Sequence, residues 1–405
     1  MNILVLNCGS SSLKYRLIKM PEEIELAGGE AQRVGPKTTE PTRIYHREAG
    51  EEETHYAEME DHAEAFRIVM KILGRNPELK PDALGHRTVH GGSRFNDHAL
   101  VDNAAVTDLE EIQHLAPIHN PPALRLLKAC REMYPDLPEA VVFDTSYHST
   151  IPEHAYTYAL PEEYRNERGI RKYGFHGTSH NFVAAEAARL LGKPFEELNA
   201  VSCHLGSGGA SLCAIKNGKS IDNTMGYSPL QGLMMSTRSG DLDPAIVLQL
   251  LVNENGDAKS VEKQLNKKSG VLGVSGVSSD IRDILSLRKN NEGDTKRINL
   301  ASNLYLWRIR KYLGAYLTLV GNADAVIFTD TVGETVPMVR QIVCSSMDVF
   351  GMKIDPEKNE NANELPADVA ADDSDVRIMV IRTNEELSIA RHTWRLINEE
   401  NCVTA

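Results

Sequence analysis

Two stretches of the chain share one pattern of apolar and polar positions. In each, a short apolar segment runs into a turn of glycine and serine, and a second apolar segment follows; the stretches are 3–16, with Gly9 in its turn, and 201–215, with Gly206 and Gly208. The pattern predicts β-hairpins whose turns expose backbone N–H groups, because glycine lacks the Cβ that would keep an anion away. A single turn of this kind is as often a plain chain reversal. Two of them indicate a duplicated phosphate-binding unit.

Elsewhere, apolar positions recur with the spacing of helices and of buried strands. Helices are predicted over 61–73, 123–130, 181–191, 245–252, 298–319 and 387–398. Buried strands are predicted over 83–89, 140–143, 325–329 and 376–381, with edge strands within 36–62 and a glycine loop over 270–276. Strands and helices alternate twice along the chain, which predicts an α/β protein of two lobes with a central cleft.

The length supports two domains, because 405 residues are enough for two cores of ordinary size. Proline and charged residues over 151–171 mark the crossover between them. The expected N-terminal lobe is 1–149, completed by the C-terminal helix at about 387–405. The expected C-terminal lobe is 150–386.

Composition removes several classes of function. Lysine and arginine number 44 against 57 acidic residues, a formal charge of -13, which disfavours a nucleic-acid partner. The six cysteines lack CxxC spacing, which argues against a disulfide framework and a structural zinc site. No signal-peptide pattern and no run of about 18 apolar residues occurs, so we expect a cytoplasmic protein without a membrane contact.

Chemically active residues follow the predicted strands. Arg87 and Asp144 stand where buried strands end, at the carboxyl edge where α/β proteins bind ligands. His176 lies between two glycines, which suits a donor in a cleft. His119, in a proline-braced loop, is either part of a substrate wall or a surface histidine on a rigid connector. Asp144 is equally typical of a helix cap or turn, and His176 of a loop histidine with internal partners.

Several long motifs together identify a family. The chain resembles the acetate/propionate kinase family of the actin, sugar-kinase and Hsp70 superfamily nearly from end to end. The resemblance implies duplicated ribonuclease H-like domains around a central cleft, and a homodimer. The motifs are Asn7-Cys8-Gly9-Ser10-Ser11-Ser12-Leu13-Lys14, His86-Arg87, Leu115-Ala116-Pro117-Ile118-His119-Asn120-Pro121, Phe143-Asp144-Thr145, Tyr173-Gly174-Phe175-His176-Gly177-Thr178-Ser179-His180, His204-Leu205-Gly206, 232–241 and Thr383-Asn384-Glu385-Glu386.

The resemblance implies reversible phosphoryl transfer from ATP to acetate, giving acetyl phosphate and ADP. It assigns the carboxylate and the moving phosphoryl group to Arg87 and Arg238, because in-line transfer needs positive groups around three equatorial oxygens. It also assigns donation to the transition state to His176, and an acid/base or orienting role to Asp144.

The resemblance extends to the ligands. Mg²⁺, or Mn²⁺, is expected at Asn7 and Glu385, with the adjacent Glu386 as the less secure alternative. The implied acyl pocket consists of Arg87, Val89, Ile118, His119, Phe175 and Pro229. The implied phosphate and nucleotide residues are Ser10, Ser12, Lys14, His204, Leu205, Gly206, Ser207, Gly208, Asp280, Ile281, Arg282, Thr331, Val332, Gly333, Glu334 and Thr335.

The sequence departs from the family pattern at three places. Ser207 replaces an asparagine, Asp330-Thr331 replaces a glycine pair on the adenosine side, and Arg382 replaces a proline. The branched Thr331 should restrict the backbone and Asp330 should add charge near an anionic ligand. The alternatives to an ATP-dependent acetate kinase are therefore a propionate kinase or an enzyme that uses pyrophosphate or another donor. A non-enzymatic clamp of the Hsp70 or actin type would lack the paired arginines and the histidine.

Overall fold

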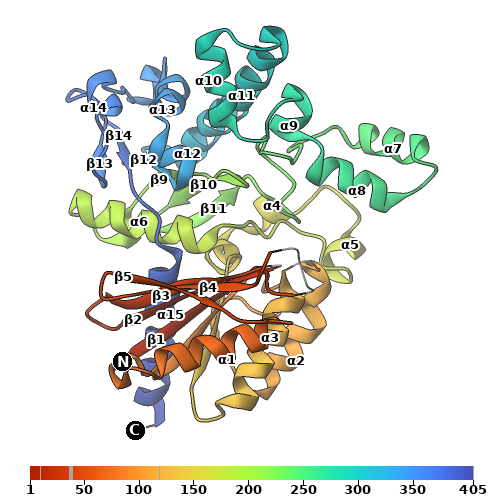
Figure 1. The fold of residues 1–405 in the computed structure, drawn as a ribbon. Coiled ribbons are helices and arrows are strands. Elements are labelled where there is room, and N and C mark those ends of the chain that lie inside the picture. The colour runs from red at the N-terminus through yellow and green to blue at the C-terminus, as the bar shows by residue number, and fades with distance from the viewer. Residues whose placement is uncertain (10, 36–39, 118, 405) are drawn as a thin grey trace. The chain divides into compact units, whose positions relative to one another are not determined.

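The chain divides into two compact units. The structure, a computed structural model, describes residues 1–9, 11–35, 40–117 and 119–404, so Ser10 and Ile118 lie outside the described residues (Figure 1). Unit 1 comprises Met1–Ser146 and Asn384–Ala405, and unit 2 comprises Tyr147–Thr383. The domain boundaries that we expect from the sequence, after residues 149 and 386, stay a prediction, because compact units need not be domains that fold independently.

Unit 1 is built on an eight-stranded sheet of order β5-β4-β3-β2-β1-β6-β8-β7. Strands β1 to β5 form an antiparallel meander, whereas β1, β6 and β8 run parallel. The strands are β1 (Asn2–Cys8), β2 (Ser12–Lys19), β3 (Ile24–Gln32), β4 (Arg43–Glu48), β5 (Glu51–Tyr56), β6 (Ala83–Thr88), β7 (Ala99–Leu100) and β8 (Glu139–Phe143).

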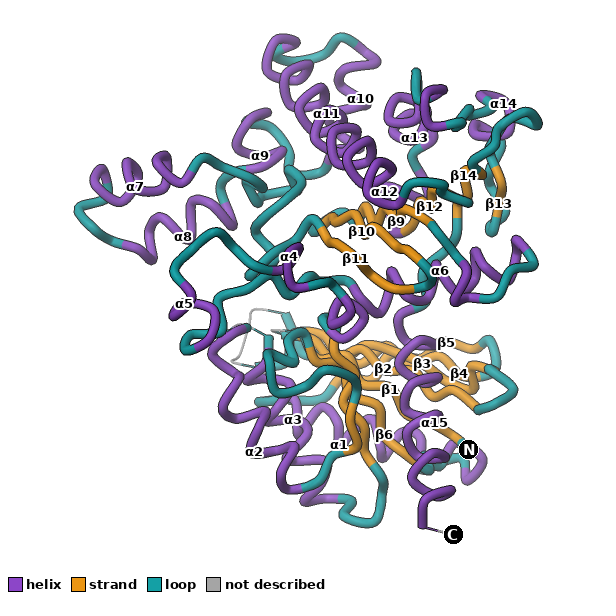
Figure 2. Tube along the Cα trace, turned by 180° about the vertical axis from the view of Figure 1, so that it is seen from behind, coloured by secondary structure: helices purple, strands orange, loops and turns teal. Residues whose placement is uncertain are grey.

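Helices cover both faces of this sheet. They are α1 (His62–Leu73), α2 (Asn103–Ile112), α3 (Asn120–Met133) and α15 (Glu385–Thr404). Side chains alternate along β1, so Leu4 and Leu6 join the core under α1 and α3 while Ile3 and Val5 pack with Ile389 of α15. Figure 2 shows α15 on the side of the sheet away from α1. A strand buried on both faces explains the continuous apolar run that opens the sequence.

Unit 2 has a six-stranded sheet of order β11-β10-β9-β12-β14-β13. Its strands are β9 (Ala200–Leu205), β10 (Ala210–Lys216), β11 (Lys219–Asn223), β12 (Ala325–Thr329), β13 (Ala367–Asp368) and β14 (Arg377–Val380). Helix α6 (Gly177–Leu191) covers one face, and α11 (Thr295–Val320) and α12 (Asp330–Thr335) cover the other (Figure 1). The remaining helices are α4 (Glu153–Tyr156), α5 (Glu162–Asn166), α7 (Pro244–Asn253), α8 (Ala258–Lys267), α9 (Gly270–Ser275), α10 (Ile281–Asn290), α13 (Pro337–Cys344) and α14 (Pro356–Glu360).

The α/β architecture predicted from the pattern is confirmed, with three local corrections. Segment 270–276 is helix α9 rather than a glycine loop, because Gly270 and Gly276 take positive φ at its ends and leave a helical turn between them. Helix α6 begins at Gly177 rather than 181, since His176 takes φ 60° just before it. Strand β3, which contains two glycines, was not predicted at all. Among the helices described, none is long and apolar enough to cross a membrane, and the cytoplasmic location stays a prediction.

Candidate active site

In unit 1, the carboxyl ends of three parallel strands bring polar side chains together around Arg87. The guanidinium donates to both carboxylate oxygens of Asp144, at 3.2 Å from Nε and 2.7 Å from Nη2. Nη1 donates to Asn7 Oδ1 at 3.2 Å, and Nε lies 3.8 Å from Glu385 Oε2. Burial alone would lower the pKa of Arg87, but the charges of Asp144 and Glu385 outweigh it and raise that pKa above its ordinary value. Arg87 is thus permanently charged and held in a fixed orientation.

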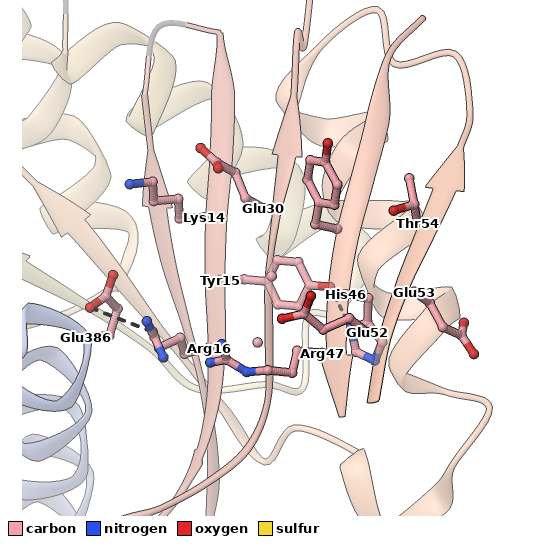
Figure 3. A pocket seen from close by; sticks show the side chains of 13 residues that line it. Lys14, Tyr15, Arg16, Glu30, His46, Arg47, Glu52, Glu53, Thr54 and Glu386 are labelled. Carbon is pink, nitrogen blue, oxygen red and sulfur yellow. Dashed lines mark hydrogen bonds and ion pairs between the residues drawn. The ribbon is translucent and has the colours of Figure 1, made fainter. Parts of the chain in front are cut away.

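The two adjacent glutamates at the start of α15 serve different arginines. Glu385 reaches Arg87, whereas Glu386 Oε2 lies 3.8 Å from Arg16 Nε. Figure 3 shows Glu386 beside Arg16 on the wall of a cavity of about 590 Å³ over strands β2 to β5, which Lys14 also lines. Glu385 therefore lies beside Arg87 in the cluster that contains Asn7, whereas Glu386 acts on Arg87 through its charge alone among the interactions described.

The donors around Arg87 suit a hard cation. Asn7 supplies an amide oxygen, and Glu385 and Asp144 supply carboxylates, which are the ligands that Mg²⁺ accepts from proteins. Across the described part of the chain, no three acidic, histidine or cysteine side chains group closely enough to enclose a metal. The set fits an ion that keeps several waters and binds through one or two protein oxygens together with a phosphate ligand.

In unit 2, the hairpin turn between β9 and β10 is crowded by polar side chains. Gly206 N donates to Gly209 O at 3.0 Å, which closes the turn. A Cβ on Gly206 would lie 2.5 Å from Asp330 Oδ2, and one on Gly209 would lie 3.4 Å from both Arg238 Nη1 and His176 Nε2. Glycine is required at 206 because a side chain would collide there. The turn therefore brings an acid, a guanidinium and an imidazole to one place.

Arg238 lacks an acidic partner in the part of the chain that the structure describes. Its Nη1 donates to Pro229 O at 3.2 Å and lies 3.8 Å from Met235 Sδ, and no carboxylate among the described residues pairs with it. Burial lowers the pKa of Arg238 from its ordinary value. A half-buried cation without a counter-ion loses part of its hydration, and an anionic ligand offsets that cost through charge-assisted hydrogen bonds. Arg238 is the strongest indication of an anion site in unit 2.

Both ring nitrogens of His204 lie within hydrogen-bond distance of another side chain. Nδ1 lies 2.9 Å from Ser179 Oγ, and Nε2 lies 3.0 Å from Asp330 Oδ2. Its ring stacks on His176, with centroids 4.1 Å apart. Burial would raise the pKa of Asp330, but the hydrogen bond and charge of His204 outweigh it and hold that pKa below its ordinary value. In this arrangement a phosphate can reach His204 only by displacing Asp330.

Comparison with known proteins identifies the family. The Acetokinase family model matches residues 2–391. The chain belongs to the acetokinase family. It is 47% identical over 407 residues to the acetate kinase of Dictyoglomus turgidum, covering 99% of this chain and 98% of that one. The acetate kinase of Acetivibrio thermocellus is 45% identical, with 98% and 99% covered.

Solved structures agree. The Porphyromonas gingivalis acetate kinase matches with a TM-score of 0.91 and 39% identity, covering 98% of this chain and 99% of that one. A propionate kinase from Francisella tularensis matches with a TM-score of 0.89 and 36% identity, covering 98% and 99%. The sequence-based resemblance and the prediction of a phosphotransferase are confirmed.

The segment 329–335, which departs from the acetokinase pattern and is predicted to lie beside the nucleotide, makes hydrogen bonds internally and to other parts of unit 2. Asp330, not Thr331, takes the positive φ, 62°, while Thr331 lies inside α12, so the backbone strain that we expected at Thr331 falls one residue earlier. Glu334 Oε1 accepts from Asp330 N at 2.9 Å and from Thr383 N at 3.1 Å. Buried Arg340 donates to the carbonyls of Gly333 and Glu334, at 2.8 and 2.9 Å. Hydrogen bonds within this segment and from two other parts of unit 2 therefore fix its ends.

The other predicted nucleotide residues lie at a helix end and on the turns. Asp280 caps α10, and Arg282 pairs with it at 2.5 Å on the surface, while Ile281 is buried. Burial raises the pKa of Tyr305, and the charges of Asp280 and Asp330 raise it further. On the turn of unit 2, Ser207 and Gly208 are exposed and Leu205 is buried. In α12, Val332 is buried and Thr335 is exposed. On β2 of unit 1, Ser12 is half-buried and Lys14 is exposed.

The predicted acyl-pocket residues are divided between the units. Val89 is half-buried and His119 exposed in unit 1. Phe175 is buried in unit 2, and Pro229 contacts Arg238 through its carbonyl. Neither unit brings the whole set together, so the pocket stays a prediction. Sequence reasoning did not single out His180 and Ser211, although the occurrence of His176 and His180 in one short motif was a signal.

Proposed function

We propose that the chain transfers a phosphoryl group reversibly between ATP and acetate, giving acetyl phosphate and ADP. The membership of the acetokinase family gives the class of reaction. The observation that carries the proposal is Arg238, a half-buried guanidinium without an acidic partner among the described residues, beside a glycine turn and His176. That arrangement suits a transferring phosphoryl group, whose negative charge is spread over three oxygens.

The residues divide the work by chemistry. Arg87 holds the acetate carboxylate, and Asp144 fixes the orientation of Arg87 through two hydrogen bonds. One acetate oxygen attacks the terminal phosphorus; the new O–P bond forms as the bond to the bridging oxygen breaks, and ADP leaves with that oxygen. Arg238 and His176 donate to the equatorial oxygens during the transfer. Mg²⁺ or Mn²⁺, when bound through Asn7 and Glu385, neutralises phosphate charge.

Acetate is proposed as the acid, with propionate as the alternative. Val89, Phe175 and Pro229 are apolar and suit a methyl group. A single extra methylene changes binding by about 1 to 3 kcal/mol in such pockets, which is too little for the residue types alone to separate the two acids. The similarity to both an acetate and a propionate kinase fits this view.

ATP is proposed as the donor, although Asp330 makes it a weaker one than the family pattern implies. Any phosphate that approaches the Gly206 turn meets the carboxylate of Asp330, which lies against that turn and occupies His204. Pyrophosphate is the alternative donor, because it needs no adenosine contact. One coupled assay of acetate and propionate against ATP, GTP and pyrophosphate, each with Mg²⁺, tests the proposal. Absence of acyl phosphate with every donor contradicts it.

A homodimer is also proposed. Helix α7 has apolar residues along its length and buries none of them: Ile246 is 46%, Leu248 64% and Val252 71% exposed. An apolar helix of this kind is typical of a protein interface, and most homo-oligomers are two-fold symmetric. Light scattering should give twice the chain mass at micromolar concentration. Leu248→Glu should give the monomer, and a wild-type monomer would contradict the proposal.

A further inference from the structure

A line of hydroxyl and imidazole groups lies between α6 and the sheet of unit 2, behind the residues that face the substrates. His180 is fully buried; its Nδ1 lies 2.9 Å from Ser202 Oγ and its Nε2 lies 2.8 Å from Ser211 Oγ. Ser211 Oγ also lies 2.8 Å from His176 Nδ1. The four groups therefore form one hydrogen-bonded chain from Ser202 to His176, and the mechanism above uses only its last member.

The direction of the hydrogen bonds follows from the number of hydrogens. Burial lowers the pKa of His180 well below its ordinary value, so the ring is neutral and carries one N–H. If Nδ1 carried it, Ser202 would accept, and the hydroxyl hydrogen of fully buried Ser202 would have no acceptor, because Ser202 Oγ has no other partner among the described residues. Buried donors are rarely left unsatisfied.

The opposite direction satisfies every group. Ser202 donates to His180 Nδ1, His180 Nε2–H donates to Ser211 Oγ, and the Ser211 hydroxyl donates to His176 Nδ1. Neutral His176 must then carry its proton on Nε2, the atom that faces Gly209 beside Arg238 Nη1. We propose that Ser202, His180 and Ser211 are positioning residues that fix His176 as the Nε2–H tautomer.

This tautomer decides what His176 offers to an anion. With the proton on Nε2, the ring donates to a phosphoryl oxygen; with the proton on Nδ1, it presents a lone pair that repels the same oxygen. Adding a proton to Nδ1 requires all the donors in the chain to reverse. His176 thus works as a neutral donor whose orientation is set before substrate binds, an inference that rests on the proposed phosphoryl transfer.

Histidine ring ¹⁵N NMR on the full-length protein without substrate tests the tautomer directly. The His176 signals are assigned by their loss in His176→Gln. In the wild type we expect a protonated Nε2 and an unprotonated Nδ1. In Ser211→Ala the hydrogen bond from Ser211 to Nδ1 is lost, so both tautomers should appear, and turnover should fall about 10- to 100-fold, the range typical of outer partners that orient a histidine. The KM for acetate should change less than about twofold, because Ser211 does not face the acid.

A matched pair at His180 separates orientation from packing. In His180→Gln, the amide oxygen accepts from Ser202 and the amide nitrogen donates to Ser211, so the tautomer and most of the turnover should be retained. In His180→Leu, that donor is lost and the outcome should match Ser211→Ala. Ser220→Ala is the control, because Ser220 makes the same kind of bond, 2.8 Å, to another buried histidine, His148.

Three results would overturn the inference. They are an Nδ1–H tautomer in the wild type, an unchanged tautomer and turnover in Ser211→Ala, and a loss in Ser220→Ala as large as that in Ser211→Ala. If His180→Leu does not fold, Ser211→Ala decides. The tautomer is measured without substrate, so a wild type that shows the Nε2–H form but does not phosphorylate acetate would reject the proposed function and leave this inference standing.

Discussion

The two arginines assigned to the reaction are held in opposite ways. Arg87 in unit 1 contacts Asp144, Asn7 and Glu385, so its charge is balanced within the protein. Arg238 in unit 2 contacts one carbonyl and one sulfur, and its charge has no balance among the described residues. The two arginines carry the same charge, but the protein balances it in unit 1 and leaves it available to a ligand in unit 2.

This difference suggests that one arginine orients a substrate and the other stabilises negative charge. A guanidinium that pairs with a carboxylate has a fixed geometry, but the carboxylate cancels part of its electrostatic potential, which suits a group that must hold a substrate in place. An uncompensated guanidinium in a partly buried site gives its whole field to charge that develops in the transition state. We therefore expect the variants of these two residues to differ in stability even where they agree in activity.

Arg87→Ala should have the largest effect. Turnover should fall by about 10²- to 10³-fold. Stability should fall by about 3 to 5 kcal/mol, because the buried carboxylate of Asp144, 2% exposed, loses both hydrogen bonds from the guanidinium and the charge that balances it. Urea unfolding and the coupled assay measure the two effects. Adding Asp144→Asn should restore much of the stability and none of the turnover; an equally unstable double variant would show that Asp144 is not the cause.

Arg238→Ala should lose as much turnover, about 10²- to 10³-fold, with no loss of stability. Removing a half-buried charge that lacks an acidic partner among the described residues relieves its desolvation, so the unfolding midpoint should stay the same or rise. Arg189→Ala on the surface of α6, where Arg189 is 66% exposed, is the control for both measurements. A marked fall in stability for Arg238→Ala would mean that the comparison of the two arginines is wrong.

Asp330→Asn should have an intermediate effect. It removes the negative charge from the Gly206 turn and frees His204 Nε2, so the KM for ATP should fall about five- to tenfold, roughly 1 to 1.4 kcal/mol of binding. The KM for acetate should not change. Replacing both Asp330 and Thr331 with glycine should give at least the same gain. If the wild type already saturates with ATP at ordinary concentrations and neither variant alters this, Asp330 does not compete with phosphate.

The last contrast concerns histidines and their dependence on pH. His204 in unit 2 and His86 in unit 1 each lie beside an acid, whereas the half-buried His98 and His392 in unit 1 face each other with ring centroids 4.1 Å apart. Loss of hydration lowers the pKa of His98 to about 3 and lowers that of His392 well below its ordinary value. Both stay neutral in the folded state, whereas the unfolded chain takes up protons near pH 6.5.

Stability should therefore be complete above about pH 6.5 and fall as the pH drops from there toward 3. At pH 5, each of the two histidines should cost about 2 kcal/mol relative to pH 7. Urea midpoints at the two pH values measure the loss. His98→Gln should reduce it, whereas His154→Gln, at an exposed position, should not. An equal loss in both variants would place the titrating groups elsewhere.

Much of the fold followed from local pattern. The apolar runs at 3–6 and 325–329 are strands in the core of each sheet, and the turn at Gly206 closes as the glycines predicted. The errors lie where glycine has several possible roles. Gly270 and Gly276 end a short helix, although glycines so close together are typical of a loop.

The sequence predicted which residues lie near one another at the strand ends, but it did not predict which side chains contact each other. Strand ends placed Arg87 and Asp144 at one sheet edge, because parallel strands bring their carboxyl ends together. The pairing of His204 with Asp330 had no local signal, since it joins the end of β9 to the start of α12 and depends on the parallel register of β9 with β12. Likewise, only the packing of α6 on the sheet places His180 between Ser202 and Ser211.

The position of α15 in the chain also has a consequence for the order of events on the ribosome. The helix covers Ile3 and Val5 and brings Glu385 to Arg87, yet the 237 residues from Tyr147 to Thr383 are synthesised before it. At about 5 to 20 residues per second, one apolar face of the first sheet waits on the order of 10 to 50 s for its cover. During that interval unit 1 has its hairpins and Arg87 in place but lacks both a closed core and Glu385. A growing chain should therefore bind a chaperone that recognises exposed apolar strands, and release it once α15 docks.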